Sequence, residues 1–251
     1  MIKKIWITGA SSGIGKALAI KFANEGWQVA ASARREKLLK DLNEQNSNIH
    51  SFPIDVKNET ETKNTFQNII KEFDNVDIAV FCTGMHDPDS EIKLNSEKIR
   101  EIMETNFFGT LNCIMAVNNY FRDKKRGHIS IVSSVAGYRG LPAASGYCAS
   151  KSALTSLAES LYFDFKRHNV RVSLVSPGFI KTPMTDKNKF PMPMIKSPEF
   201  AAEKMFIGLT KKNAFEIHFP IAFTMMMKLL KIMPNWLYFL LVKKGMRTIK
   251  Y

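Results

Sequence analysis

The chain has 251 residues, of which 45% are hydrophobic, and this length and composition fit one domain with an ordinary core. Only three cysteines occur, Cys82, Cys113 and Cys148. They form neither a CxxC pair nor a His/Cys cluster, so we expect no disulfide and no metal site. The first apolar run is too short for a signal peptide, and we expect a cytoplasmic protein.

The formal charge of +13 is concentrated in the last part of the chain. Residues 1–180 carry 23 Lys and Arg against 19 Asp and Glu, whereas residues 181–251 carry 13 against 4. A basic tail suits anionic lipid, an acidic carrier protein or nucleic acid, or it is simply a solvated surface. Because no nucleic-acid recognition motif accompanies the charge, we expect no nucleic-acid partner.

Six short β-branched runs alternate with amphipathic helical stretches along the first 180 residues. Strands are predicted at residues 2–7, 28–32, 49–54, 78–82, 128–132 and 170–175. Helices are predicted at residues 15–25, 36–44, 59–72, 96–120 and 147–168. This alternation implies right-handed crossovers and an α/β fold built on a doubly wound parallel sheet.

A glycine-rich turn joins the first predicted strand to the first helix, and it reads Thr8-Gly9-Ala10-Ser11-Ser12-Gly13-Ile14-Gly15. The glycines permit a tight turn in which backbone N–H groups approach a pyrophosphate at the helix N-terminus. The spacing is GxxxGxG, and TGASSGIG closely resembles the cofactor loop of short-chain dehydrogenases/reductases. The resemblance implies a Rossmann fold and a dinucleotide held by Gly9, Ser11, Ser12, Gly13, Ile14 and Gly15.

The end of the second strand bears on which dinucleotide is bound. In the family, an acidic residue there holds the 2′-hydroxyl of NAD, whereas a neutral residue followed by arginine favours the 2′-phosphate of NADP. This sequence has Ser32-Ala33-Arg34-Arg35 at that place. Guanidiniums without a carboxylate favour NADP(H) over NAD(H), with Arg34 as the expected contact and Arg35 as a second contact or the start of the next helix.

The ends of the next two strands carry further family positions. Asp55 and Val56 match the family's adenine-binding pair, although an aspartate at a strand end also caps turns. The fourth strand departs from the pattern, because it ends in Phe81-Cys82-Thr83-Gly84 where relatives usually have Asn-Asn-Ala-Gly. Gly84 keeps the close backbone approach to the cofactor, and we expect the lost asparagine to alter stability rather than chemistry.

Tyr147 and Lys151 are four residues apart and share one face of a predicted helix. An ammonium beside a phenol favours the phenolate, which brings the phenol pKa from about 10 toward neutral. Ser134, at the end of the fifth strand, lies where the family has a serine that bonds the substrate oxygen. Ser133 should point the other way, into packing. The resemblance assigns Asn106 to a water held against the lysine.

The resemblance covers about residues 1–185, a cofactor-binding and catalytic core, and it ends in a Pro-Gly turn. That turn lies beside the nicotinamide in the family and supplies Pro177, Gly178, Ile180 and Thr182 as cofactor contacts. The implied activity is an NADP(H)-dependent interconversion of a carbonyl and a secondary alcohol, with Tyr147 as the acid/base and Lys151 also holding the ribose. The family also implies a homodimer or homotetramer.

Residues 186–251 are predicted to form a substrate lid and amphipathic C-terminal helices within the same domain. The stretch 219–247 is apolar and basic, and Pro234-Asn235 divides it into two parts too short to span a membrane. Aromatics, methionines and flanking lysines suit an interfacial helix at the inner face of an anionic membrane. A substrate lid or a subunit interface would be apolar as well, so the three roles remain open.

This tail favours a hydrophobic or lipid-like carbonyl substrate. The alternatives are a 3-oxoacyl group on an acidic carrier protein, for which the basic surface would be the dock, or a non-catalytic NADP-binding sensor or scaffold. The presence of Asn106, Ser134, Tyr147 and Lys151 together argues against the non-catalytic role.

Overall fold

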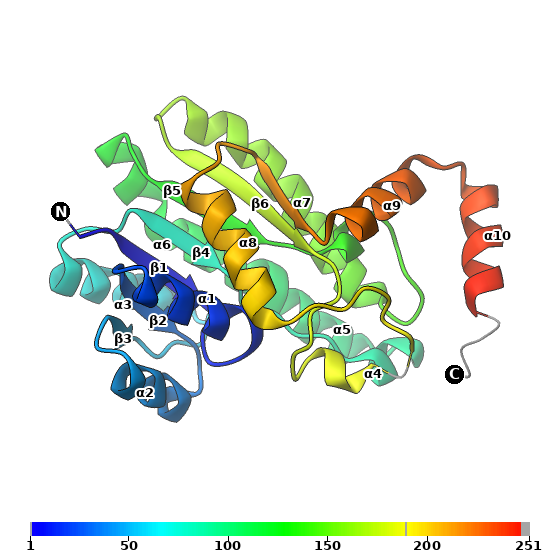
Figure 1. Ribbon diagram of the computed structural model, residues 1–251, viewed down its shortest axis with the longest axis horizontal. Coiled ribbons are helices and arrows are strands. Elements are labelled where there is room, and N and C mark those ends of the chain that lie inside the picture. Colours follow the sequence, from blue (N-terminus) through cyan, green and yellow to red (C-terminus); the bar gives the residue numbers. More distant parts are fainter. Residues whose placement is uncertain (1, 189, 247–251) are drawn as a thin grey trace.

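Parallel strands form the centre of this computed structural model, which describes residues 2–188 and 190–246 (Figure 1). Within these residues seven strands pair in the order β3-β2-β1-β4-β5-β6-β7. Their bounds are β1 Lys4–Thr8, β2 Gln28–Ser32, β3 Ile49–Ser51, β4 Ile78–Phe81, β5 His128–Val132, β6 Arg171–Pro177 and β7 Glu216–Phe219. The predicted doubly wound parallel sheet is confirmed.

Helices cover both faces of the sheet, because successive side chains of each strand point to opposite sides. Ile5 and Ile7 of β1 pack into one core, whereas Trp6 between them packs into the other. The first core is closed by α1 (Gly13–Asn24), α2 (Glu36–Gln45) and α8 (Pro198–Thr210). The second is closed by α3 (Glu59–Phe73), α6 (Gly109–Lys124) and α7 (Ser145–Lys166).

Several elements differ from the sequence prediction, among them the short helix α4 (Pro88–Ile92), which was not predicted. The helix predicted at 96–120 is α5 (Ser96–Met103) followed by a π-helical turn, Glu104–Phe108, and then α6. The edge strand β7 was not predicted, since it has only four residues, of which Ile217 and Phe219 are buried and Glu216 and His218 are half-buried. A run this short gives a weak alternation signal.

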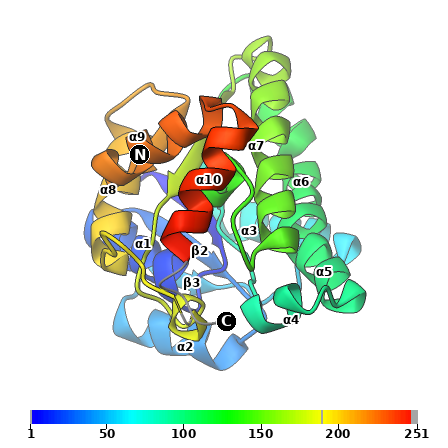
Figure 2. The same ribbon diagram turned by 90° about the vertical axis from the view of Figure 1, so that its right-hand side faces the viewer.

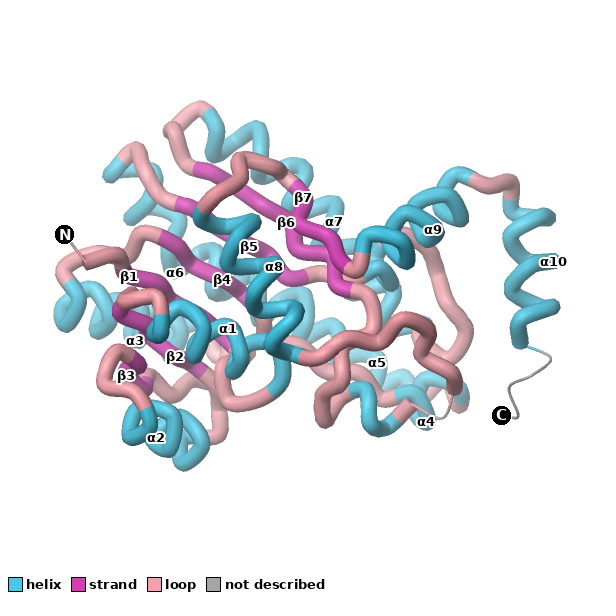
Figure 3. The backbone as a smooth tube through the Cα atoms, in the orientation of Figure 1, coloured by secondary structure: helices cyan, strands magenta, loops and turns pink. Residues whose placement is uncertain are grey.

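The carboxyl ends of the strands meet along one edge of the sheet, where loops follow the strands (Figure 3). The short helix α4 (Pro88–Ile92) lies in the connection after β4. Two further helices, α9 (Ile221–Ile232) and α10 (Asn235–Met246), lie beyond this edge, and α10 stands in front of it in the turned view (Figures 1 and 2). None of the helices in the described ranges combines the length and the apolar character needed to cross a bilayer.

Candidate active site

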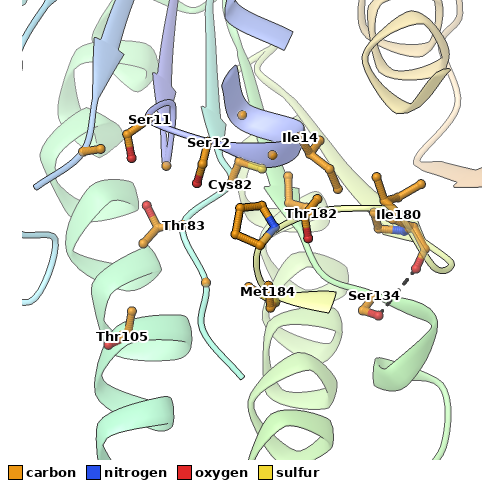
Figure 4. A pocket seen from close by; sticks show the side chains of 18 of the residues that line it. Ser11, Ser12, Ile14, Cys82, Thr83, Thr105, Ser134, Ile180, Thr182 and Met184 are labelled. Atoms are coloured by element: carbon orange, nitrogen blue, oxygen red, sulfur yellow. Dashed lines mark hydrogen bonds between the residues drawn. The ribbon is translucent and has the colours of Figure 1, made fainter. Parts of the chain in front are cut away.

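A cavity of about 370 Å³ lies at the carboxyl edge of the sheet. Its wall contains Ser134 and every residue predicted to contact a cofactor, which are Gly9, Ser11, Ser12, Gly13, Ile14, Gly15, Arg34, Arg35, Asp55, Val56, Gly84, Tyr147, Lys151, Pro177, Gly178, Ile180 and Thr182. Figure 4 shows residues of the glycine turn near one end of this wall and Ser134 near the other. The fold thus brings together segments that are far apart in sequence.

The glycine turn has the shape of a phosphate cradle. Gly9 has a φ of +71°, and a Cβ atom there would lie 2.8 Å from the carbonyl oxygen of Cys82. A Cβ atom on Gly15 would lie 2.4 Å from the oxygen of Gly9. Ser12 is the N-cap residue of α1, but its side chain makes no hydrogen bond to the helix. The first backbone N–H groups of α1 therefore have no side-chain cap at this end of the cavity. These features fit a dinucleotide pyrophosphate.

Arg35 rather than Arg34 is tied to the glycine turn. Its Nε and Nη2 atoms donate to the Ser11 hydroxyl at 3.1 and 2.8 Å, and Nη2 donates to the Ser12 hydroxyl at 2.7 Å. Arg34 also lines the cavity, but none of the hydrogen bonds found in the described residues fixes it there. The sequence argument had favoured Arg34 because it could not show which side chain folds back over the turn.

Asp55 lines the cavity together with Val56, and its carboxylate also serves the local turn. The Oδ1 atom accepts a hydrogen bond from the backbone N–H of Lys57 at 3.1 Å. The turn cap is therefore present, and the contact with an adenine stays a prediction for a residue on the cavity wall.

The catalytic candidates converge from β5 and α7. The Lys151 ammonium is buried and donates to the carbonyl oxygen of Val132 at 2.9 Å, and it lies 5.7 Å from the centre of the Tyr147 ring. The Ser134 hydroxyl donates to the Pro177 carbonyl at 3.5 Å and accepts from the N–H of Ala136 at 3.1 Å (Figure 4). The oxygen of a substrate, the Tyr147 phenol and the Ser134 hydroxyl could meet at this end of the cavity.

Ser133 was predicted to turn into packing, and this is confirmed. It is buried, and its hydroxyl donates to the carbonyl oxygen of Lys151 at 2.8 Å and lies 3.0 Å from the Thr155 hydroxyl. The alternation of side chains along a strand accounts for the difference between Ser133 and Ser134.

Burial controls the protonation of the Tyr147 and Lys151 pair. It raises the pKa of the Tyr147 phenol to about 12, against the opposing effect of the nearby Ser134 hydroxyl. It lowers the pKa of the Lys151 ammonium to about 8. This differs from the expectation that the ammonium would bring the phenol toward neutral pKa, because desolvation dominates and Lys151 donates to Val132. The phenol therefore keeps its proton at neutral pH.

Asn106 lies in the π-helical turn and is completely buried. Its Oδ1 atom accepts from the N–H of Met85 at 2.7 Å, while Nδ2 donates to the Met85 carbonyl and to the Ser150 hydroxyl, both at 3.0 Å. The Ser150 hydroxyl in turn donates to the carbonyl of Tyr147 at 2.8 Å. Asn106 thus links the connection after β4 to the helix that carries Tyr147.

Two residues beside Tyr147 were missed by the sequence analysis. The carboxylate of Glu91 is buried, accepts from the N–H of Tyr147 at 3.0 Å and lies 2.8 Å from Nδ1 of His86. The His86 ring lies 4.7 Å from the Tyr147 ring, centre to centre. A single glutamate in a polar stretch usually faces solvent, so no signal in the sequence distinguished Glu91.

The segment after β4 that departs from the family pattern is linked to β1 through its backbone. The N–H of Cys82 donates to the Thr8 hydroxyl at 3.3 Å and so links β4 to β1. Further cavity residues that the sequence analysis did not assign to the site include Cys82, Thr83, Thr105, Pro183, Met184 and Thr185, several of which are labelled in Figure 4.

Comparisons with known proteins agree with this geometry. A family model described as short chain dehydrogenase matches residues 3–191. An uncharacterized oxidoreductase of Myxococcus xanthus is 34% identical over 236 residues, which are 92% of this chain and 93% of that protein. The 3-oxoacyl-[acyl-carrier-protein] reductase of Thermotoga maritima is 28% identical, covering 83% of this chain and 91% of its own.

A solved short-chain dehydrogenase of Streptomyces avermitilis superimposes with a TM-score of 0.83 over 100% of both chains at 20% identity, which shows the shared fold. Because the family model covers most of the chain and the Myxococcus relative is similar over nearly its whole length, the family is established. This chain belongs to the short-chain dehydrogenases, a family of oxidoreductases that use nicotinamide cofactors.

Proposed function

We propose that this protein is an NADP(H)-dependent oxidoreductase that reduces a carbonyl group of a hydrophobic substrate to a secondary alcohol. One observation carries the proposal: Ser134, Tyr147 and Lys151 line the same cavity as the glycine turn with Arg35 folded against it. This common space supports a reaction between a bound dinucleotide and a substrate held by these three residues.

The preference for NADP(H) rests on the cluster of Arg35, Ser11 and Ser12. A guanidinium and two hydroxyls within hydrogen-bonding distance of one another offer several donors to a ribose 2′-phosphate. The end of β2 carries no carboxylate that would repel this group. Arg34, which also lines the cavity, adds a second positive charge.

The reduction needs one hydride and one proton. When bound, the reduced nicotinamide supplies the hydride to the carbonyl carbon. Tyr147, protonated at neutral pH, donates its proton to the carbonyl oxygen, and the O–H bond of the phenol breaks as that of the alcohol forms. Ser134 orients the oxygen by a hydrogen bond, while Lys151 holds the ribose and stabilises the phenolate left behind. Asn106 fixes the backbone beside them.

A hydrophobic substrate is supported by the residues around the catalytic end. Pro183 and Met184 belong to the cavity wall. Behind the Pro177-Gly178 turn, an apolar cluster of Val135, Tyr138, Phe223 and Met227 packs against Phe179 and Leu230. An apolar chain attached to the carbonyl could bury surface against this side.

A panel of carbonyl compounds, followed by the absorbance of NADPH and of NADH, tests cofactor and activity together. We expect turnover with NADPH, and we expect Tyr147→Phe to lower the rate by roughly 10²–10⁴-fold. NADPH binding by this variant, measured by fluorescence titration, should stay near that of the wild type. An unchanged rate in Tyr147→Phe would disprove the mechanism, and NADPH binding without turnover on any compound would favour a sensor.

The second candidate is reduction of a 3-oxoacyl group on a carrier protein, which the similarity to the Thermotoga reductase favours. The excess of 13 Lys and Arg over 4 Asp and Glu in residues 181–251 would suit an acidic carrier. Rates on a free long-chain ketone and on a carrier-bound 3-oxoacyl group, compared at equal concentration, distinguish the two substrates.

A further inference from the structure

We propose that α9 and α10 form a docking face for an anionic lipid bilayer, which seats the protein with the carboxyl edge of its sheet toward the membrane. The docking face consists of exposed apolar side chains on these helices, namely Ile221, Met225, Met226, Leu229, Ile232, Trp236, Phe239, Leu240 and Leu241. The proposal deepens the hydrophobic substrate class of the proposed function, but docking is measured without turnover, so each can fail alone.

Exposed apolar side chains are strongly concentrated on these two helices. Of 18 large hydrophobic residues exposed in the described ranges, nine belong to the docking face, with exposed fractions from 41% to 77%. Scattered exposed hydrophobics are normal on a protein surface, whereas a contiguous group marks a contact with a partner or a membrane. We therefore expect the docking face to contact a partner or a membrane.

The docking face is one side of helices whose other side is packed. In α9, Phe223 and Met227 are buried against Val135 and Tyr138, while the exposed residues 221, 225, 229 and 232 recur at helical spacing. In α10, Tyr238 is only 3% exposed, and its hydroxyl donates to the carbonyl of Gly140. Packing thus points the apolar stripe outward.

Arg139 holds the corner between the two helices. Its Nη1 atom donates to the carbonyl oxygens of Leu230, Lys231 and Met233 at 2.7, 3.1 and 2.7 Å, and Nη2 donates to Oδ1 of Asn235 at 2.5 Å. The guanidinium also lies 4.1 Å from the centre of the Tyr238 ring. Both helices are thereby tied to the segment between Ser134 and Tyr147.

Charge selects lipid over a second copy of the chain. Residues 217–251 contain six Lys and Arg and no Asp or Glu, and one of these cations, Lys228, pairs with Glu216 just before the segment. A two-fold interface would bring this positive segment against itself, whereas the headgroups of an anionic bilayer complement it. Trp236 and Phe239, which are 70% and 62% exposed, are the residue types that insert at the membrane interface.

The position of the helices gives docking a consequence for the cavity. Both helices lie beyond the carboxyl edge, on the side of the sheet where the cavity is found (Figures 1 and 2). Phe223 of α9 packs directly on Gly178 of the cavity wall. A Cβ atom added to Gly178 would lie 2.7 Å from the ring of Phe223. A bilayer seated on the docking face would therefore be the nearest apolar reservoir for the substrate.

The three tryptophans of the chain provide a test without labelling. Trp6 and Trp27 are 0% and 8% exposed, so a shift of the emission on adding vesicles reports Trp236. We expect a blue shift and co-sedimentation with phosphatidylserine-containing phosphatidylcholine vesicles, and at least tenfold weaker partitioning onto pure phosphatidylcholine. Raising the salt concentration should weaken binding to the anionic vesicles.

The decisive variant is Phe239→Glu/Leu240→Glu, with Phe163→Glu on α7 as the matched control because Phe163 is 65% exposed. We expect the double variant to lose at least tenfold in vesicle partitioning and the control to bind like the wild type, with circular dichroism and NADPH binding unchanged in both. Equal losses in both variants, or no emission shift in the wild type, would overturn the proposal. A double variant that changes only the mass seen by light scattering would assign the face to a second copy.

Discussion

The guanidinium of Arg35 bridges the hydroxyls of Ser11 and Ser12, so three donors meet at one end of the cavity. Replacing Arg35 with leucine removes the charge from that group. Since a hydrogen bond to a charged group is worth about 1.5–3 kcal/mol, we expect the KM for NADPH to rise roughly 10- to 100-fold while that for NADH stays nearly constant. Initial rates with each cofactor measure this change.

Arg34→Leu is the matched control for the Arg35 variant. Among the described residues, no hydrogen bond holds the Arg34 side chain in the cavity, so we expect this variant to show the smaller rise in the KM for NADPH. A larger rise in the KM for NADPH in Arg34→Leu would show that Arg34, as expected from the sequence, is the main contact of the phosphate.

The lowered pKa of Lys151 predicts how cofactor binding responds to pH. With a pKa of about 8, the buried ammonium is charged below that pH and neutral above it. If the charged form holds the ribose, NADPH affinity is full only well below pH 8 and falls as pH rises through this value. Fluorescence titrations between pH 6.5 and roughly pH 9.5 measure the change, and an affinity that is flat across this range would contradict it.

Site residues within motifs could be predicted from the sequence, whereas residues defined by tertiary contacts could not. Gly9, Tyr147 and Lys151 lie at fixed spacings in local segments, so one pattern finds them and the cavity contains them. Glu91 acquires its importance only because α4 folds against the N-terminus of α7, and there its carboxylate meets the N–H of Tyr147. No short window of sequence encodes that approach.

At the level of elements, the corner between α9 and α10 depends on Arg139. Arg139→Ala removes the donors to the carbonyls of Leu230 and Met233, so we expect trypsin to cleave after Lys231 and Lys243 at least about tenfold faster, which corresponds to 1.4 kcal/mol of local opening. Timed digestion with mass spectrometry follows these cuts.

Arg126→Ala removes an exposed arginine far along the chain from the corner and serves as the control for that digestion. Its cuts after Lys231 and Lys243 should appear at the wild-type rate, although the cut after residue 126 is lost. If Arg139→Ala digests no faster than this control, apolar packing by Tyr238 and Phe223 suffices to hold the helices.

Long periodic elements were predictable, whereas short or irregular ones were not. The runs that became β1, β5 and α7 are strongly patterned, and the structure confirms them to within a few residues. The π-helical turn Glu104–Phe108 inserts into an otherwise regular helix, and its sequence gives no break in apolar spacing. Burial of Asn106, satisfied by Met85 and Ser150, accompanies that irregularity.

For the whole molecule, the strand–helix alternation was sufficient to predict the sheet, but the placement of the tail depends on contacts between distant segments. The cavity likewise draws its wall from segments after six strands, β1 to β6, so filling it should tie those segments together. We expect NADPH at about 100 times its Kd to stabilise the fold by about 2.7 kcal/mol, which raises the melting temperature by roughly 5–11 °C.

Thermal melts with NADPH, with NADH and without cofactor measure this stabilisation. NADH at the same concentration should give the smaller rise, because it lacks the phosphate that Arg35 would bind. Equal rises with the two cofactors would contradict the assignment of the Arg35 cluster to the 2′-phosphate.

Cys82 gives this molecule a chemical reporter of its own occupancy. The thiol lines the cavity, and burial raises its pKa to about 11, so only about one molecule in 10⁴ carries a thiolate at pH 7. Alkylation by iodoacetamide should accordingly be slow, and a dinucleotide lying over the thiol would slow it further. The rate of alkylation at Cys82, followed by mass spectrometry, would then report the fraction of molecules with an empty cavity, without any enzymatic assay.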